Sequence, residues 1–350
     1  MPSETHFWRQ AFCRLYETRV PIVPLGKIMH WRAVVDALGV ETSTARDLVL
    51  VTDDYFYRPH SAAPTAAELD AHRHEGAVGG AQWLLYPVVR HDGADMPAPR
   101  GFVELPWFVE AEFVVRDSLD RDLRGLLGGA RWRELSRLVR RADEHFEWEV
   151  ATGAGVDDET LVAFDRLHQL NLAKYGHSRN HFSLSLLRDI AISALRERVC
   201  VFLHRRQSDG APVQAVLGMH YPESNTLEVL VQGIDHTAVA RSQNLYAVAL
   251  YRIYRWGLAR DIHRFNLGRG AQLAKLNLGA NRFHVVSNHI APVDDTRPGD
   301  FDALQAAARA AIDKALVVLG TAADRRDGGG NVMLPERTEI AERGRGKVIA

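Results

Sequence analysis

The sequence has 350 residues, enough for two compact domains of roughly 150 residues each. No apolar run approaches the ~20 residues of a membrane-spanning helix, and residues 1–19 alternate charged with aromatic side chains instead of forming a signal peptide. We therefore expect a cytoplasmic protein with no membrane partner. The 43 basic and 44 acidic residues give a net charge of -1, which argues against nonspecific coating of DNA or RNA but leaves room for a local basic patch.

The two cysteines, Cys13 and Cys200, are far apart and lack the spacing of zinc ligands, so we expect no disulfide framework and no metal site. Only five basic residues are lysines, so a lysine within a motif carries more weight than an arginine. These are Lys27, Lys174, Lys275, Lys314 and Lys347.

The first third of the chain mixes helical and strand-like patterns. Residues 5–18 place their apolar side chains on one side, which predicts a helix. Runs rich in Val, Leu and aromatic residues predict strands. The strand predictions are 47–52, 81–90 and 101–116, with a short helix within 60–80 and a surface connection at 91–100.

A glycine cluster at 125–129 (GLLGG) predicts an internal boundary. It divides the chain into an N-terminal half, 1–125, a C-terminal domain, 126–322, and a mobile tail, 323–350, that is too poor in apolar residues to order itself. In the C-terminal domain the periodicity predicts helices at 131–146, 157–175, 183–198, 245–260 and 301–319, and strands at 147–152, 199–205, 212–221, 226–233, 264–267 and 282–290.

The order of these elements predicts an α/β fold. The strands at 199–205, 212–221 and 226–233 are separated by turn signals and should form an antiparallel meander. The long helix at 245–260 should then return the chain to a parallel strand at 264–267. This places the N-terminus of that helix at the open edge of the sheet, where ligands of α/β proteins bind.

The segment 244–282 ends a helix with Trp-Gly, continues as the strand Phe265-Asn266-Leu267-Gly268-Arg269-Gly270, and then carries Lys275 and the pair Gly279-Ala280. It resembles the C-terminal GNAT-type acyltransferase domain of the Fem-like families, which include the peptidoglycan aminoacyl-tRNA-dependent transferases and the FemAB or CelD-like N-acyltransferases. The resemblance implies tandem GNAT-like domains, with mixed sheets flanked by helices and a degenerate first half. It also implies transfer of an aminoacyl or acyl group to an amine of a small molecule or peptide.

Within this segment the catalytic candidates are Lys275 and Arg269. Gly268 and Gly270 flank Arg269 and allow a tight strand exit close to a ligand, where Arg269 can contact a phosphate or carboxylate. The resemblance implies that Lys275 lies near the reacting ester and stabilises negative charge on an oxygen. The alternatives are a structural turn with a solvated arginine, and an exposed lysine on a short helix.

The donor is predicted from the segment 235–246 (DHTAVARSQNLY), which contains no glycine. A glycine-free loop is poorly suited to cradle the pyrophosphate of CoA, so an aminoacyl-tRNA is the preferred donor. An acyl-CoA or carrier-protein thioester is the alternative, and no tightly bound cofactor is expected. The donor-binding candidates are Arg241, Ser242, Asn244, Tyr246, Gly268 and Gly270, of which Ser242 and Asn244 can instead simply cap the helix.

Polar side chains near the end of the meander, His220, Gln232 and His236, are candidates for orienting the acceptor amine or carrying its proton. Tyr175 lies in a polar loop that can cover the cleft. Because the chain has 16 histidines, a histidine can also lie near the proposed site by chance and have no role in it. The arginines of the helix at 131–146 can follow an RNA backbone or form a solvated face, and a noncatalytic GNAT-fold binding protein is the remaining alternative.

Overall fold

The computed structural model describes residues 22–24, 48–51, 66–90, 102–176, 180, 182–193, 195–294, 302–324 and 332–334. The expected helix at 5–18, Cys13 and most of the expected tail lie outside these residues. Contacts within the chain divide it into two compact units, residues 1–110 with 283–320 and 334–350, and residues 111–282 with 321–333. Each unit is described by itself. The predicted three-part division of the chain stays a prediction.

The first unit holds strands in the order β1-β2-β3-β10-β4. Strands β1 and β2 are antiparallel, β2 and β3 are parallel, and β3 and β10 are antiparallel. Leu50, Ala81 and Leu84 form a buried cluster between this sheet and α3. The elements are β1 (Ile22–Pro24), β2 (Leu48–Val51), α3 (Ala66–Val78), β3 (Trp83–Arg90), the first part of β4 (Val103–Val114), β10 (Arg282–Pro292) and most of α9 (Asp302–Asp324).

The second unit continues from the end of β4 in the order β4-β9-β8-β7-β6-β5. Strands β5 to β8 are antiparallel neighbours, and β8 pairs with β9 in parallel, as the sequence predicts. Its elements are α4 (Leu119–Asp143), β5 (Phe146–Thr152), α5 (Asp158–Lys174), α6 (Leu184–Ala191), β6 (Val199–Arg206), β7 (Pro212–Tyr221), β8 (Thr226–Ile234), α7 (Leu245–Leu258), β9 (Arg264–Arg269) and α8 (Gln272–Leu276).

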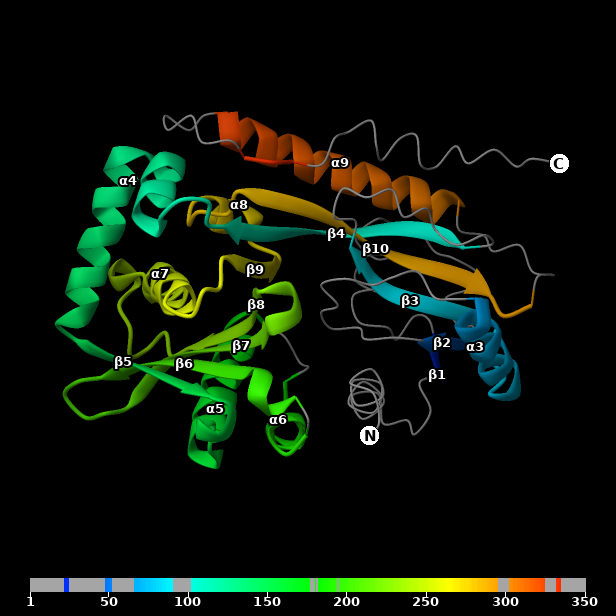
Figure 1. Ribbon diagram of the computed structural model, residues 1–350, viewed down its shortest axis with the longest axis horizontal. Helices are drawn as coiled ribbons and strands as arrows, with labels where there is room; N and C mark the ends of the chain where they lie inside the picture. Colours follow the sequence, from blue (N-terminus) through cyan, green and yellow to red (C-terminus); the bar gives the residue numbers. More distant parts are fainter. Residues whose placement is uncertain are drawn as a thin grey trace. The chain divides into compact units, whose positions relative to one another are not determined.

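Helices cover both faces of the second unit's sheet, with α7 on one face and α5 and α6 on the other (Figure 1). The alternation along β6 explains this arrangement, because successive side chains of a strand point to opposite faces. Phe202 meets the ring of Trp256 on α7, and buried Val201 and Leu203 point to the opposite face. The α/β class with mixed sheets flanked by helices is therefore confirmed.

Two expected helix boundaries are wrong. The helix expected from 131 begins at Leu119, so the glycine cluster at 125–129 lies inside α4, where Gly128 (φ 75°, ψ 161°) makes a kink between two helical segments. The expected helix at 183–198 ends as α6 at Ala191, because the Ser193 hydroxyl donates to the Ile190 carbonyl oxygen and closes the helix.

Among the described residues, no helix is both long and apolar enough to cross a membrane.

Candidate functional site

The central feature of the candidate site is an opening between β8 and β9. Among the described residues, their parallel pairing runs from Thr226 opposite Arg264 to Glu228 opposite Asn266, and there it ends. Strand β8 continues six residues further, to Ile234. The later part of β8 therefore has β7 on one side and, among the described residues, no paired strand on the other. We call this unpaired edge, between β8 and the end of β9, the opening.

The main-chain oxygen of Gln232 points into this opening. The amide of Asp235 donates to the Val213 oxygen on β7 (2.9 Å), and in an antiparallel pair alternate residues bond to the same neighbour. The main-chain groups of residues 231, 233 and 235 thus bond to β7. Those of Gln232 point away from β7. Its oxygen accepts hydrogen bonds from Nδ1 of His168 and Nδ2 of Asn171, both 3.4 Å away on α5.

Helix α5 reaches this position because Gly233 lets it lie directly on β8. A Cβ atom placed on Gly233 would lie 2.3 Å from both the His168 nitrogen and the Leu167 carbonyl carbon, far inside van der Waals contact. Any side chain at position 233 would push α5 away from the strand. Glycine is therefore needed for the close approach that delivers the polar side of α5 to the opening.

The His168 side chain is 4% exposed and sits between aromatic rings. It stacks on Phe164 (centroids 5.7 Å apart) and meets Phe182 edge-on. Burial lowers the pKa of His168, opposed by its bond to the Gln232 oxygen and by the charge of Asp165. Asp165 is itself held by Asn180 and Gln169, at 2.9 and 2.6 Å.

On the α7 face of the sheet, a series of hydrogen-bonded side chains reaches Gln232 from β6 and β7. His204 is fully buried and its Nδ1 lies 2.8 Å from Oε1 of Gln214. Gln214 in turn donates to Oε1 of Gln232 at 3.2 Å. Burial and the charge of Arg252 lower the pKa of His204 to about 3, so its imidazole is neutral. This chain of side chains fixes the Gln232 amide.

The exit of β9 lies at the same edge, because the carboxyl ends of parallel strands meet there. Gly268, Gly270 and Ala271 all have positive φ (70°, 70° and 49°), which turns the chain sharply into α8. Lys275 is 5% exposed, and its Nζ donates to the Arg269 oxygen at 2.7 Å. The structure thus brings together the two predicted catalytic candidates, and Lys275 is buried at the strand exit, which overturns the alternative of an exposed lysine.

The predicted donor residues lie before and at the start of α7. Arg241 and Ser242 are exposed within a short 3-10 turn, and Tyr246 is half-buried. Asn244 precedes α7 in the left-handed conformation (φ 42°) and makes no side-chain capping bond, so the alternative of a capping role does not hold for this residue. Gln243 closes the turn instead by accepting from the Ala240 amide at 2.8 Å.

Three of the four acceptor candidates lie together. Nε2 of His236 is 3.3 Å from Oδ1 of Asn171, Gln232 contacts the same helix, and Tyr175 (61% exposed) follows its C-terminal end. His220 pairs with Leu227 at the start of β8, at the opposite end of the strand from Gln232. The expectation that His220 joins this group is wrong, because the antiparallel turn after β7 places it there.

His168 and Asn171 were not among the predicted site residues. Both lie within the helix that the apolar periodicity predicts at 157–175. Their spacing of three residues places them on one side of α5, and two polar residues one turn apart beside apolar neighbours are the signal that was available.

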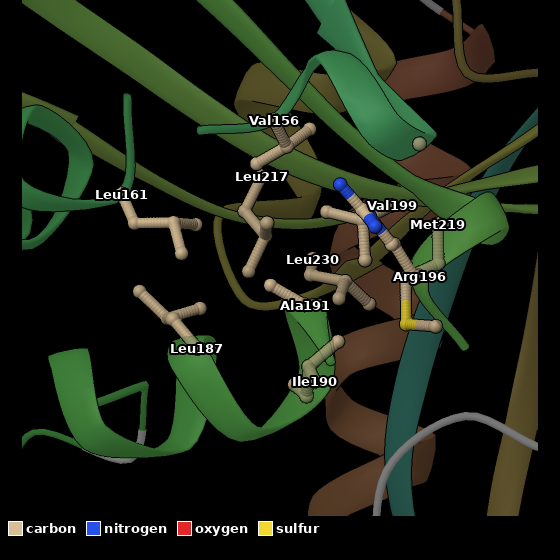
Figure 2. Close-up of a pocket in the computed structure, with 11 residues that line it drawn as sticks. Val156, Leu161, Leu187, Ile190, Ala191, Arg196, Val199, Leu217, Met219 and Leu230 are labelled. Carbon is tan, nitrogen blue, oxygen red and sulfur yellow. The ribbon is translucent and has the colours of Figure 1, made fainter. Parts of the chain in front are cut away.

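A separate apolar cavity lies between α6 and the sheet (Figure 2). Among the described residues that line it, Arg196 is the only charged one, and its guanidinium donates to the Ala154 oxygen at 3.3 Å. This described lining offers no group suited to proton transfer, so we do not assign the reaction to the cavity. The remaining lining residues are Gly153, Val156, Leu161, Leu187, Ile190, Ala191, Val199, Leu217, Met219 and Leu230.

Two arginines of α4 form hydrogen bonds with other side chains. Arg137 forms a bidentate pair with Glu134 (2.6 and 2.8 Å), and Arg131 donates to Oδ1 of Asn277, just after α8, at 2.7 Å. Within the described part of the chain, no group of three or more His, Cys, Asp or Glu side chains is placed to hold a metal ion.

Comparisons with solved structures support this architecture, whereas no family model and no curated protein matches the sequence. L-PGS from Bacillus licheniformis aligns with a TM-score of 0.50 at 11% identity, over 74% of this chain and 81% of that one. The chain therefore shares the fold of that structure. FemX aligns at 0.49 and 12% identity over 69% and 80% of the two chains, and a tandem GNAT protein from the clavulanic acid biosynthesis pathway at 0.39 and 9% identity over 65% and 69%. At these identities the likeness concerns the fold alone.

Proposed function

We propose that this protein is an acyltransferase that moves an aminoacyl or acyl group from an activated donor to an amine, with an aminoacyl-tRNA as the preferred donor. The observation that carries the proposal is the position of Lys275. Its buried ammonium is held at the exit of β9, at the edge where β8 and β9 separate. A fixed positive charge at such an opening suits a reaction that develops negative charge on an oxygen.

The chemistry is direct attack of the amine nitrogen on the carbonyl carbon of the donor ester. The carbonyl oxygen becomes negatively charged in the tetrahedral intermediate, and the Lys275 ammonium stabilises it. The intermediate then collapses with cleavage of the bond between the carbonyl carbon and the donor oxygen. Gln232, His236 and Tyr175, beside the same opening, orient the acceptor amine.

The form of the β8–α7 connection supports the preference for tRNA over CoA. The segment 235–244 contains no glycine, and only Asn244 within it has a left-handed backbone. Its first turn is built around Asp235, whose carboxylate accepts from the amides of Thr237 and Ala238. A cradle of successive main-chain amides for pyrophosphate is therefore missing from this connection. The resemblance of 244–282 to Fem-like transferases favours the same donor.

The proposal is tested by fluorescence anisotropy of a labelled aminoacyl-tRNA pool with the full chain at a stated salt concentration. Deacylated tRNA, CoA and acetyl-CoA serve as competitors. Saturable binding that CoA does not displace, followed by loss of the aminoacyl group when amines are added, is the expected result. Binding to CoA without binding to tRNA would indicate that the donor is an acyl thioester and not an aminoacyl-tRNA. Binding without release of the aminoacyl group would indicate a noncatalytic binding protein.

A further inference from the structure

The imidazole of His168 lies beside the edge of β8 that β9 has left. There the Gln232 oxygen accepts its hydrogen bonds from the side chains of His168 and Asn171. The ring is buried between Phe164 and Phe182, and His168 is 4% exposed. A group bound at this edge of β8 would lie next to the imidazole.

The contact with Gln232 also fixes which ring nitrogen carries the proton. A main-chain oxygen only accepts hydrogen bonds, so Nδ1 of His168 must be the protonated nitrogen in this contact. In the neutral ring the lone pair then lies on Nε2. The imidazole is thus oriented by Nδ1 and offers Nε2 as a base.

The surroundings favour the neutral ring. Phe164 and Phe182 flank it, and burial lowers the pKa of His168. Asp165, one turn earlier on α5, is the charged group that acts on the ring, and its two oxygens are occupied by Asn180 and Gln169. From β8 the ring meets the uncharged main-chain oxygen of Gln232.

We propose that His168 is the general base that accepts the proton of the acceptor amine. As the amine nitrogen bonds to the carbonyl carbon of the donor, its proton passes to Nε2 and the ring becomes an imidazolium. When the carbon–oxygen bond to the donor breaks, the same proton passes from Nε2 to the departing oxygen. The base is thereby restored without any further reactant. This inference rests on the proposed acyltransferase function.

Other histidines of this unit fit the role less well. His204 is fully buried behind Gln214. His220 lies at the opposite end of β8. His236 is exposed, and its Nε2 contacts Asn171, so it is placed to bind rather than to act in a site shielded from water.

The test measures transfer from an aminoacyl-tRNA pool to two nucleophiles. Glycinamide is a basic amine that needs a general base, whereas hydroxylamine is a strong nucleophile that needs one much less. We expect His168→Gln, which keeps a donor for the Gln232 oxygen, to lower the rate with glycinamide by about 100-fold to 10,000-fold while hydroxylamine still reacts. His263→Gln, an exposed position beside Asp261, is the matched control and should behave as wild type.

The outcomes separate the two levels of the proposal. Wild-type protein that transfers to neither nucleophile overturns the acyltransferase function itself, and the role of His168 with it. Equal rates for wild type and His168→Gln with glycinamide overturn the role of His168 alone. Nitrogen NMR of the imidazoles gives an independent result. A His168 ring at pH 7 with Nδ1 protonated and Nε2 bare supports the role, and a ring protonated on Nε2 overturns it.

Discussion

Gly233 on β8 and Leu167 on α5 approach so closely that a methyl group on the glycine would lie 2.3 Å from the Leu167 carbonyl carbon. This contact sets the position of α5 against the sheet, and with it the position of His168 at the opening between β8 and β9.

Gly233→Ala is expected to destabilise the protein by about 3 kcal/mol, because two stretches of main chain must move apart. Urea unfolding followed by circular dichroism measures the change. Gly125→Ala, in a helical part of α4 with open space around the new methyl group, is the control and should stabilise by up to about 1 kcal/mol. Equal stability of Gly233→Ala and wild type would show that α5 does not rest on β8 as described.

Glu112 forms a buried ion pair that ties the end of β4 to β9. Its carboxylate is fully buried and accepts from Nε and a terminal nitrogen of Arg264, at 3.2 and 3.0 Å. Glu112→Ala removes the buried carboxylate that holds the Arg264 guanidinium and should lower the free energy of unfolding by about 3 kcal/mol. Glu149→Ala breaks a more exposed pair with Arg205 and should cost less than about 1 kcal/mol. Similar losses in both variants would contradict this account.

The buried His204 should make the protein sensitive to acid. Its pKa is about 3 in the folded state and near 6.5 when unfolded, so the unfolded chain binds the extra proton between these values. The contribution of His204 to the free energy of unfolding is fully present above about pH 6.5. It falls as the pH drops, by up to about 1.4 kcal/mol per pH unit. His204→Asn removes the titrating group. Its unfolding free energy should change less steeply between pH 6 and 4, and an unchanged slope would refute the assignment.

Lys275→Ala tests the proposed oxyanion contact. Loss of the ammonium should reduce turnover by about 100-fold to 1,000-fold while donor binding changes little, because the charge acts on the transition state. Single-turnover transfer and anisotropy measure the two quantities. Lys314→Ala on α9, in the other unit, is the control for loss of a lysine. Weakened donor binding with unchanged turnover would assign Lys275 to binding.

Much of the second unit could be predicted because its strands are short, strongly apolar and bounded by turn residues. The parallel return to β9 followed from one long amphipathic helix between two strands, and it correctly placed Arg269 and Lys275 at one edge. The burial of Lys275 could not be predicted, because it depends on the Arg269 oxygen to which Nζ donates.

The missed features depend on contacts between distant segments. The glycines at 125–129 suggest that the helix begins only after them, yet the buried leucines on both sides of Gly128 keep α4 helical from Leu119. His220 seemed close to Gln232 because both lie in neighbouring strands, whereas the register places them at opposite ends of β8. His168 depends on the separation of β9 from β8 and on the lack of a side chain at Gly233, and neither is visible in the pattern of α5.

We propose that the donor binds at the opening between β8 and β9. Hydrogen exchange of the full chain with and without the aminoacyl-tRNA pool, and separately with acetyl-CoA, tests this most directly. We expect the bound donor to slow amide exchange in 229–236, 241–248 and 268–276, the end of β8, the start of α7 and the exit of β9, and to leave α6 (184–191), which borders the apolar cavity, unchanged. Protection confined to 184–191 or to the first unit, with no change at the end of β8 and the exit of β9, would contradict it.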